Sequence, residues 1–493
     1  MKRSALSKSR TMETNGGPGF DGLGGSGIAQ HELGVHPILD MFGSVKEDNS
    51  MESFWESRVK PIEPLSHKGT ATFQMEGIYN SFIDPGSMRL QGKIRVRKRV
   101  DNAAAVNLDS SDNGKVTLIN YWVHALIQSA HVSMNGTSVA SLSASEYAYK
   151  AFLEKIATFS KEAALSHGVT EGYQPDCDVG DNMEKVVERI KSDKTKDADQ
   201  PKYGNEIRSE WLCTNGGVIG FCAALNLDFC ALGKLWLDML PINLCLTLSD
   251  DKFFLLTTAP ETGATAKKVE YFVEYLDLAL TMRRVKLLGP MKERIEKSLM
   301  NDQKAIYTFT KSTVKKYHIP KDQTNFSWNQ AVIGKLPHHT VMTFVSQSAV
   351  NGDLMKNPFR LQHFNCKEVY YTFNGTEFPC ERYRPEWGVG MSYLKEYGKF
   401  IDELVSGRFN SSHQINHEAW ANSARFLLAC DQSVDSCSGF HHHDTKRGSM
   451  SIFGSFKEAL TENVVLILYC SFRDQIQIDA ARRVYTEGSL TAL

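Results

Sequence analysis

Two short patterns and one longer segment recur in this 493-residue chain, in the same order and about one domain-length apart. The first is a strand-like segment that ends in Asn-Gly, at Asn135-Gly136 and again at Asn374-Gly375, an offset of 239 residues (374 − 135). Asn-Gly is the favoured centre of a two-residue type I′ hairpin, because both central residues need positive φ. A duplication constrains the fold strongly, because it requires two similar domains in one chain.

The second repeated pattern is an amphipathic helix, Tyr-x-x-Phe-aliphatic-acid-x-aliphatic, at 149–156 and 397–404. The offset is 248 residues (397 − 149). Its apolar residues fall at i, i+3, i+4 and i+7, which places them on one helix face. The predicted helix core is Tyr149, Phe152, Leu153 and Ile156 in the first copy, and Tyr397, Phe400, Ile401 and Leu404 in the second.

The third match aligns 240–256 with 460–476, with Asn243 opposite Asn463. On this alignment the step from the helix Tyr to the Asn is 94 residues in the first copy and 66 in the second (243 − 149 and 463 − 397). The first copy is then expected to carry a 28-residue insertion (94 − 66). The polar, turn-rich stretch 166–209 is the expected place for this surface excursion, with a short helix at 182–190.

Most of the remaining pattern is typical of short strands, rich in β-branched and aromatic residues and broken by Gly, Asn, Asp and Pro. Helices are expected only at 145–163, 290–303 and 392–407. Many strands and few helices over two domain-lengths predict an all-β chain of paired sandwiches or barrels. The strand-like segments are 70–83, 92–100, 131–142, 226–232, 242–249, 252–258, 305–314, 339–350, 367–378, 425–432 and 462–472.

The domain organisation follows from these patterns. Residues 1–64, with the glycine-rich stretch 16–27, are expected to form a flexible amino-terminal arm, partly disordered. The two copies are expected at 65–289 and 290–480, followed by a carboxy-terminal tail at 481–493.

The net charge of −1 argues against electrostatic binding of nucleic acid by the chain as a whole. Two local basic groups remain as candidates for contact with DNA or a partner. One lies on the arm, and the other on one face of the strand 92–100, opposite Ile94 and Val96. An ordinary solvated face is the simpler interpretation of the second group. The two groups are Lys2, Arg3, Lys8 and Arg10, and Lys93, Arg95, Arg97 and Arg99.

The sequence contains no constellation that indicates catalysis, a metal or a cofactor. His441, His442 and His443 lie in a polar segment, and His413 and His417 lack the HExxH pattern, so a solvated loop is favoured over zinc. We expect neither a catalytic residue nor a bound cofactor. No apolar run reaches the roughly 18 residues of a membrane helix. The amino terminus lacks a signal-like apolar run, and cysteines within apolar runs indicate reduced core thiols in an intracellular protein.

Several segments together resemble a known family. They are 119–136 with 146–154, 283–290, the block VNGDLMKNPFRLQHFN (350–365), 369–379 and 448–479. They are similar to the capsid proteins of Polinton (Maverick) elements and adintoviruses, including homologues integrated in animal genomes. The similarity runs in pieces from about 75 to 480. Where relatives tend to have Phe-Asp-Leu-Thr-Pro, this chain has ACDQSVDSC (429–437), which puts the loop there in doubt.

The resemblance implies a double jelly-roll major capsid protein, with two tandem eight-stranded jelly-roll β-sandwiches. The chain length favours a major over a minor protein, because penton proteins of the family have one roll. A homotrimer would present six similar wedges and tile a shell around double-stranded DNA. The implied partners are other copies of the chain, a minor or penton protein and packaged DNA. The implied location is the virion, assembled inside the host cell.

Two other interpretations stay open. A capsid-derived host protein could keep the core pattern and lose the trimer contacts. A carbohydrate- or receptor-binding module could use the same jelly-roll scaffold, although the sequence shows no cluster of aromatic and acidic residues typical of a sugar or calcium site.

Overall fold

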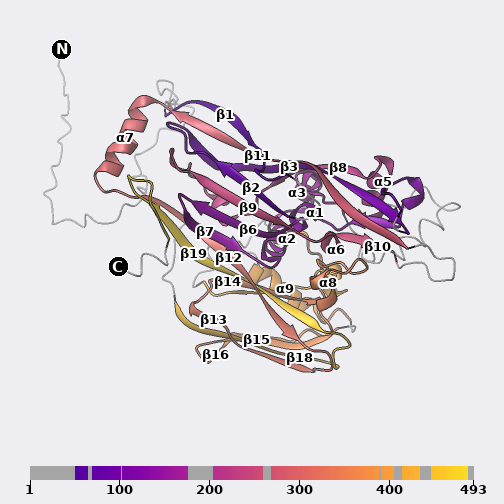
Figure 1. Cartoon of the computed structure of the whole chain (residues 1–493). Coiled ribbons are helices and arrows are strands. Elements are labelled where there is room, and N and C mark those ends of the chain that lie inside the picture. The colour runs from indigo at the N-terminus through magenta and orange to yellow at the C-terminus, as the bar shows by residue number, and fades with distance from the viewer. Residues whose placement is uncertain are drawn as a thin grey trace, which may run out of the picture. The chain divides into compact units, whose positions relative to one another are not determined.

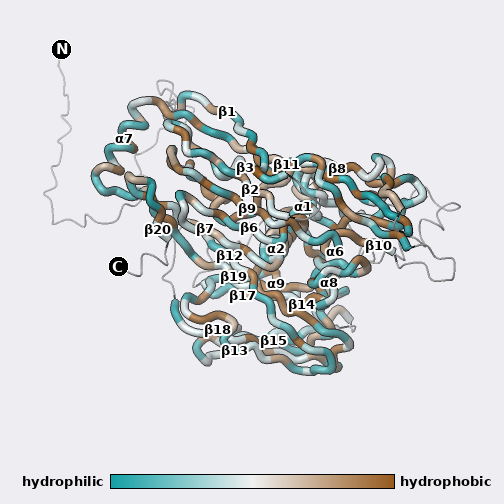
Figure 2. The backbone as a smooth tube through the Cα atoms, viewed as in Figure 1, coloured by the Kyte–Doolittle hydropathy of each residue, from teal (hydrophilic) through white to brown (hydrophobic). Residues whose placement is uncertain are grey.

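The computed structural model describes residues 50–64, 69–101, 103–175, 204–258, 268–387, 390–404, 413–422, 424–433 and 446–486. It is mostly β, with two sandwiches built from four main antiparallel sheets. Figure 1 shows the first sandwich in indigo to magenta and the second in orange to yellow. Apolar and polar stretches alternate along many of the strands, as expected where one face of each sheet lies in a core (Figure 2).

The first sandwich pairs a sheet of order β1-β11-β3-β8 with a sheet of order β2-β9-β6-β7. The small strand β4 (Val106–Asn107) extends the first sheet, and β5 (Val116–Leu118) pairs separately with β10 (Leu255–Thr257). The main strands are β1 (Met51–Val59), β2 (Thr70–Met75), β3 (Phe82–Val100), β6 (Ile127–Met134), β7 (Thr137–Leu142), β8 (Val218–Ala224), β9 (Ile242–Leu248) and β11 (Val269–Leu287).

The second sandwich repeats this topology strand for strand, with sheets of order β12-β19-β14-β17 and β13-β18-β15-β16. Each sandwich therefore has the strand order of an eight-stranded jelly roll. We call them the first roll and the second roll. The strands are β12 (Ala305–Ile319), β13 (Asn325–Lys335), β14 (His339–Ser346), β15 (Cys366–Phe373), β16 (Thr376–Tyr383), β17 (Leu428–Asp431), β18 (Arg447–Phe456) and β19 (Val464–Ile478).

Short helices fill the connections between the strands. The two longest amphipathic patterns give α2 (Glu146–Thr158) and α9 (Leu394–Leu404), and α7 (Gly289–Met300) connects the rolls. The expected helix 145–163 stops at Thr158, and α3 (Lys161–Ser166) restarts behind the cap of Ser160. The other helices are α1 (Trp122–Ala125), α5 (Gly204–Thr214), α6 (Asp251–Phe254), α8 (Gln347–Asn351), α10 (His417–Ala421) and the 3₁₀ turns η2 (Ser110–Asp112), η3 (Gly168–Glu171) and η4 (Asp228–Ala231). No described helix is both long and apolar enough to cross a membrane.

Two of the three repeated patterns occupy equivalent places in the two rolls. Asn135-Gly136 turns β6 into β7, and Asn374-Gly375 turns β15 into β16. All four residues have positive φ, at 46° and 80° in the first turn and 50° and 85° in the second, as a type I′ turn requires. The two helices, α2 and α9, each follow the second strand of that hairpin.

The third match is wrong. It aligned β9 with β19, whereas the strand order makes β18 the counterpart of β9 and β11 the counterpart of β19. The predicted 28-residue insertion is therefore also wrong. The step from Tyr149 to the start of β8 is 69 residues and that from Tyr397 to the start of β17 is 31, so the first roll is longer here by 38 residues (69 − 31).

Other expectations from the sequence also need correction. Residues 51–59, assigned to the arm 1–64, form β1, because their backbone pairs with β11. Residues 484–486, assigned to the tail, form β20 (Val484–Thr486) beside β19. The expected strand 226–232 is instead η4, and 251–254 of the expected strand 252–258 is α6. The expected surface excursion 166–209 has buried ends, since Glu171 and Arg208 are enclosed, and the expected helix 182–190 lies outside the described residues.

Candidate functional site: the junction between the rolls

Aromatic side chains of α2 join the first roll to the second. The ring of Phe152 stacks on Phe359 of the second roll, with centroids 4.2 Å apart and planes 5° apart. Tyr149 packs edge-on against the same ring, and its hydroxyl donates to the carbonyl oxygen of Pro358 at 3.2 Å. The guanidinium of Arg425 lies 5.0 Å from the centre of the Phe152 ring. The helix core predicted from the repeat is therefore part of a contact between the two domains.

The second copy of this helix is covered differently. Phe400 of α9 is also buried, but it packs against Trp420 of its own roll. The hydroxyl of Tyr397 donates to the carbonyl of Ile415, again within the second roll. Leu153 and Ile156 of α2 are buried, and Ile401 and Leu404 of α9 are partly buried against the core.

A polar cluster also crosses the junction beside the aromatic rings. The buried Nζ of Lys150 lies 3.0 Å from Glu154 Oε2 and 3.1 Å from Asp228 Oδ1. Burial opposes the charge of Lys150, but the two carboxylates outweigh it and raise the pKa of the ammonium group. From the second roll, the hydroxyl of Tyr469 donates to Glu154 Oε1 at 2.8 Å and the backbone N–H of Ser312 donates to Asp228 Oδ2 at 3.0 Å.

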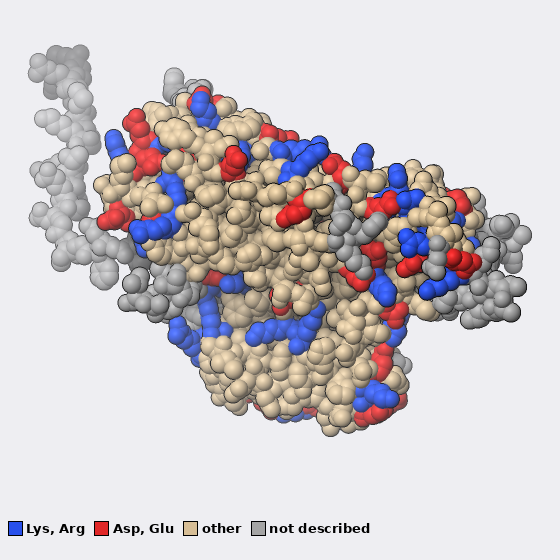
Figure 3. All heavy atoms as spheres, viewed as in Figure 1, with Lys and Arg blue, Asp and Glu red and all other residues tan. Residues whose placement is uncertain are grey.

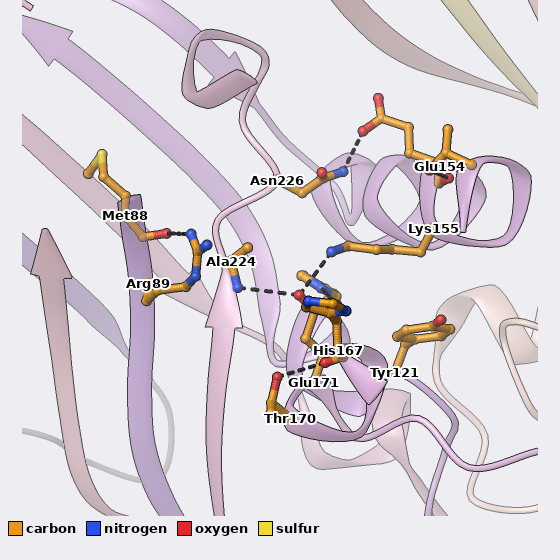
Figure 4. Close-up of polar contacts among 12 residues, drawn as sticks. Met88, Arg89, Tyr121, Glu154, Lys155, His167, Thr170, Glu171, Ala224 and Asn226 are labelled. Carbon is orange, nitrogen blue, oxygen red and sulfur yellow. Dashed lines mark hydrogen bonds and ion pairs between the residues drawn. The ribbon is translucent and has the colours of Figure 1, made fainter. Parts of the chain in front are cut away.

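Glu171 anchors the far end of α2 within the first roll (Figure 4). Its carboxylate lies 2.9 Å from Lys155 Nζ and 3.3 Å from His124 Nε2, and it accepts the backbone N–H of Ala224 in β8 at 3.3 Å. Burial alone would raise the pKa of Glu171, but His124 and Lys155 together lower it to about 2. The cluster ties α2, η3 and β8 together beneath the junction.

A second polar contact joins the rolls at their opposite end. Arg482 follows the last long strand of the second roll, and its guanidinium lies 2.8 Å from Asp238 Oδ1 and 2.9 Å from Glu296 Oε1. The carbonyl of Arg482 accepts the side-chain amide of Asn135 at 2.9 Å. The hairpin turn of the first roll thus contacts the end of the second roll.

The central strand β19 shows how closely the rolls are joined. Residues Val464 to Ser471 are all buried, although successive side chains of a strand point to opposite faces. One face lies in the core of the second roll. The other carries Tyr469, which contacts α2 of the first roll. A strand buried on both faces reads as a continuous apolar run, as VVLILYC does here.

The predicted basic strand face lies on β3 and is largely balanced by acids on β11. Arg97 forms an ion pair with Glu274 at 2.8 Å, and Arg99 lies 3.9 Å from Glu270. In the pairing register Lys93 stands opposite Asp277 and Arg95 opposite Glu274. Figure 3 shows basic and acidic side chains interspersed over the visible face of the molecule. This arrangement favours a neutralised sheet face over a surface that attracts DNA.

The other candidate residues are placed as follows. Lys2, Arg3, Lys8, Arg10 and His441–His443 lie outside the described residues. His413 and His417 are engaged with Ile415 and Tyr393. Among the described residues, no group of three or more His, Cys, Asp or Glu side chains is arranged to hold a metal ion.

Sequence reasoning missed the half of the junction that the second roll supplies. Phe359 and Pro358 belong to the NPF block that marked the family resemblance, but nothing in their local pattern pointed to α2. Tyr469 and Ser312 lie in strand-like runs whose partners are distant in sequence. The available signal was the uninterrupted apolar run of β19, which predicts burial on both faces.

No protein-family model matches the sequence. An uncharacterized protein of Caenorhabditis elegans is 21% identical over 319 residues, which cover 64% of this chain and 67% of that protein. A chain of the Sputnik virophage structure superimposes with a TM-score of 0.58 at 9% identity, over 94% of both chains. For the faustovirus major capsid protein the TM-score is 0.51 at 8% identity, over 88% of this chain and 92% of that one.

The mavirus major capsid protein superimposes over 96% of this chain and 97% of its own length, with a TM-score of 0.50 at 10% identity. The similarity thus spans both rolls in each of these structures. The chain has the fold of double jelly-roll major capsid proteins.

Proposed function

We propose that this chain is a major capsid protein that forms pseudo-hexameric homotrimers, which tile an icosahedral shell around double-stranded DNA. The observation that carries the proposal is the repetition of one jelly roll, strand for strand, in two rolls joined through a buried junction. Three such chains supply six similar wedges, the number that a hexagonal lattice position requires.

The finer assignments belong to the same proposal. The chain is a relative of Polinton and adintovirus capsid proteins, acts in the virion without catalytic chemistry, and is assembled inside the host cell. Its partners are further copies of itself and a minor or penton protein. Because acids on β11 balance the basic strand face, Lys2, Arg3, Lys8 and Arg10 are the better candidates for contact with packaged DNA.

The first test is the mass of the purified protein in solution by light scattering, with negative-stain images of the same fraction. One chain weighs 55.3 kDa, so a trimer weighs 165.9 kDa (3 × 55.3) and is expected to look pseudo-hexagonal. A monomer at every protein concentration, salt and pH tested contradicts the proposal.

One observation favours a second candidate, a capsid-derived host protein. The nematode protein that matches this chain shows that related sequences occur among animal proteins. Such a protein is expected to keep the fold and to form no shells, so images taken across assembly conditions separate the two candidates.

A further inference from the structure

The first strand of the second roll, β12, is covered by the first roll. It pairs on one side with β19, and along its other edge it meets first-roll residues in three places. The hydroxyl of Tyr307 donates to the carbonyl of Leu235 at 3.0 Å, and the ammonium of Lys316 donates to the carbonyl of Ala144. Between them lies the backbone contact of Ser312 with Asp228. The free edge of β12 is thus closed within the chain.

The equivalent strand of the first roll, β1, lacks such a cover. It pairs with β11 as β12 pairs with β19, and most of its side chains are exposed. Phe54 stands opposite Val285, two residues before the end of β11, and Tyr307 stands opposite Ile476, two residues before the end of β19. At these matching positions Tyr307 is 5% exposed and Phe54 is 64% exposed.

Other apolar residues of β1 are exposed as well. Met51 is 52% exposed and Trp55 is 39% exposed, on opposite faces of the strand from Phe54 or beside it. Leu276 on the paired strand β11 is 43% exposed, whereas the corresponding part of β19 is buried on both faces. An open edge strand with exposed large apolar side chains is a site at which other chains pair or pack.

We infer that β1 and the adjoining part of β11 receive the second roll of a neighbouring copy of this chain. The inference rests on the proposed trimer and identifies its contact surface. In a ring of three chains, first and second rolls alternate. The contact from second roll to next first roll then repeats the contact that joins first to second within each chain.

The repeated relation also identifies the opposing surface. Within the chain, α2 packs against β12, so between chains α9 packs against β1. Asp402 of α9 holds the position of Glu154 of α2, at the same offset of 248 residues (402 − 154) as the other helix residues. Glu154 accepts the hydroxyl of Tyr469 across the junction, whereas Asp402 is exposed. Its carboxylate is therefore placed to meet the neighbouring copy.

The test compares Phe54→Asp with a matched control, Ile333→Asp. Ile333 is 67% exposed on β13, an edge strand of the second roll. We expect the wild type and Ile333→Asp to be trimers by light scattering. Phe54→Asp is expected to be a monomer at the same concentration, with an unchanged thermal midpoint, because burying a carboxylate in an apolar contact is unfavourable.

Hydrogen exchange on the wild-type trimer gives a measurement that does not depend on the folding of a variant. The amides along the free edge of β1 are expected to exchange more slowly than those along the free edge of β13. If the wild type is a trimer, but β1 exchanges as fast as β13 and Phe54→Asp stays trimeric, the contact surface is wrong and the proposed trimer stands. A monomeric wild type overturns both. A wild-type trimer in which β1 is protected supports the inference even if Phe54→Asp fails to fold.

Discussion

At Glu171, one buried carboxylate contacts side chains from two other elements and a backbone N–H from a third. Removing one member of a buried ion pair leaves the other charge without compensation, and this costs more than the pair itself contributes. The importance of Glu171 therefore lies in Lys155, whose ammonium group would otherwise be enclosed without a counter-charge. The residue acts on stability through the placement of α2.

We expect Glu171→Gln to lower the free energy of unfolding by about 3 kcal/mol at neutral pH. The pKa of Glu171 is about 2 in the folded chain, below the roughly 4.3 of an unfolded glutamate. Its stabilisation is thus fully present above about pH 4.3 and is lost as the pH falls towards 2. Urea unfolding of both proteins between pH 7 and pH 3 measures this, and a difference in stability that stays constant over that range contradicts it.

At the scale of elements, α2 and α9 share one sequence pattern but differ in their surroundings. Phe152 and Phe400 occupy the same helix position and are both 0% exposed. Phe152 is covered by Phe359 of the other roll, and Phe400 by Trp420 of its own. The pattern fixed by the duplication is therefore the amphipathic helix, and the use of its apolar face differs between the copies.

Truncating either ring should cost about 3–5 kcal/mol, the usual range for a buried Phe→Ala change. The two variants are expected to differ in where the protein loosens. Phe152→Ala should speed hydrogen exchange in the second-roll segment around Phe359 as well as in α2, whereas Phe400→Ala should leave that segment unchanged. Equal effects of both variants on the Phe359 segment would show that α2 does not couple the rolls.

The elements that the sequence predicted correctly, and those it missed, differ in how local their cause is. The all-β class and the amphipathic helices follow from periodicity and residue type over ten or so residues. β1 escaped because it is an edge strand without a buried face, so MESFWESRV shows no alternation of apolar and polar residues. β19 was matched to β9 because both are short apolar runs, and only the pairing of distant strands distinguishes them.

At the scale of the whole molecule, the buried junction makes the two rolls depend on each other. Separating them would expose the face of β19 that carries Tyr469, together with the ring of Phe152. Two domains that share a large apolar contact are expected to unfold together.

We therefore expect a single unfolding transition in scanning calorimetry, with a van't Hoff enthalpy equal to the calorimetric enthalpy. Measurement on the monomeric form keeps the trimer contact out of the result. Two resolved transitions in the wild-type monomer would contradict the dependence of one roll on the other. The double variant Phe152→Ala/Tyr469→Phe should broaden or split the transition.

The contact between Asn135 and Arg482 also sets an order in time. The two residues are 347 positions apart, so the hairpin of the first roll waits for its partner while the intervening chain is synthesised. At about 5–20 residues per second, that interval is roughly 17–70 s. During it the nascent first roll exposes α2 and the carboxylate of Asp238 to solvent and to chaperones. A truncated product released in that interval would lack the surface that α2 requires, so quality control can recognise it before it reaches a growing particle.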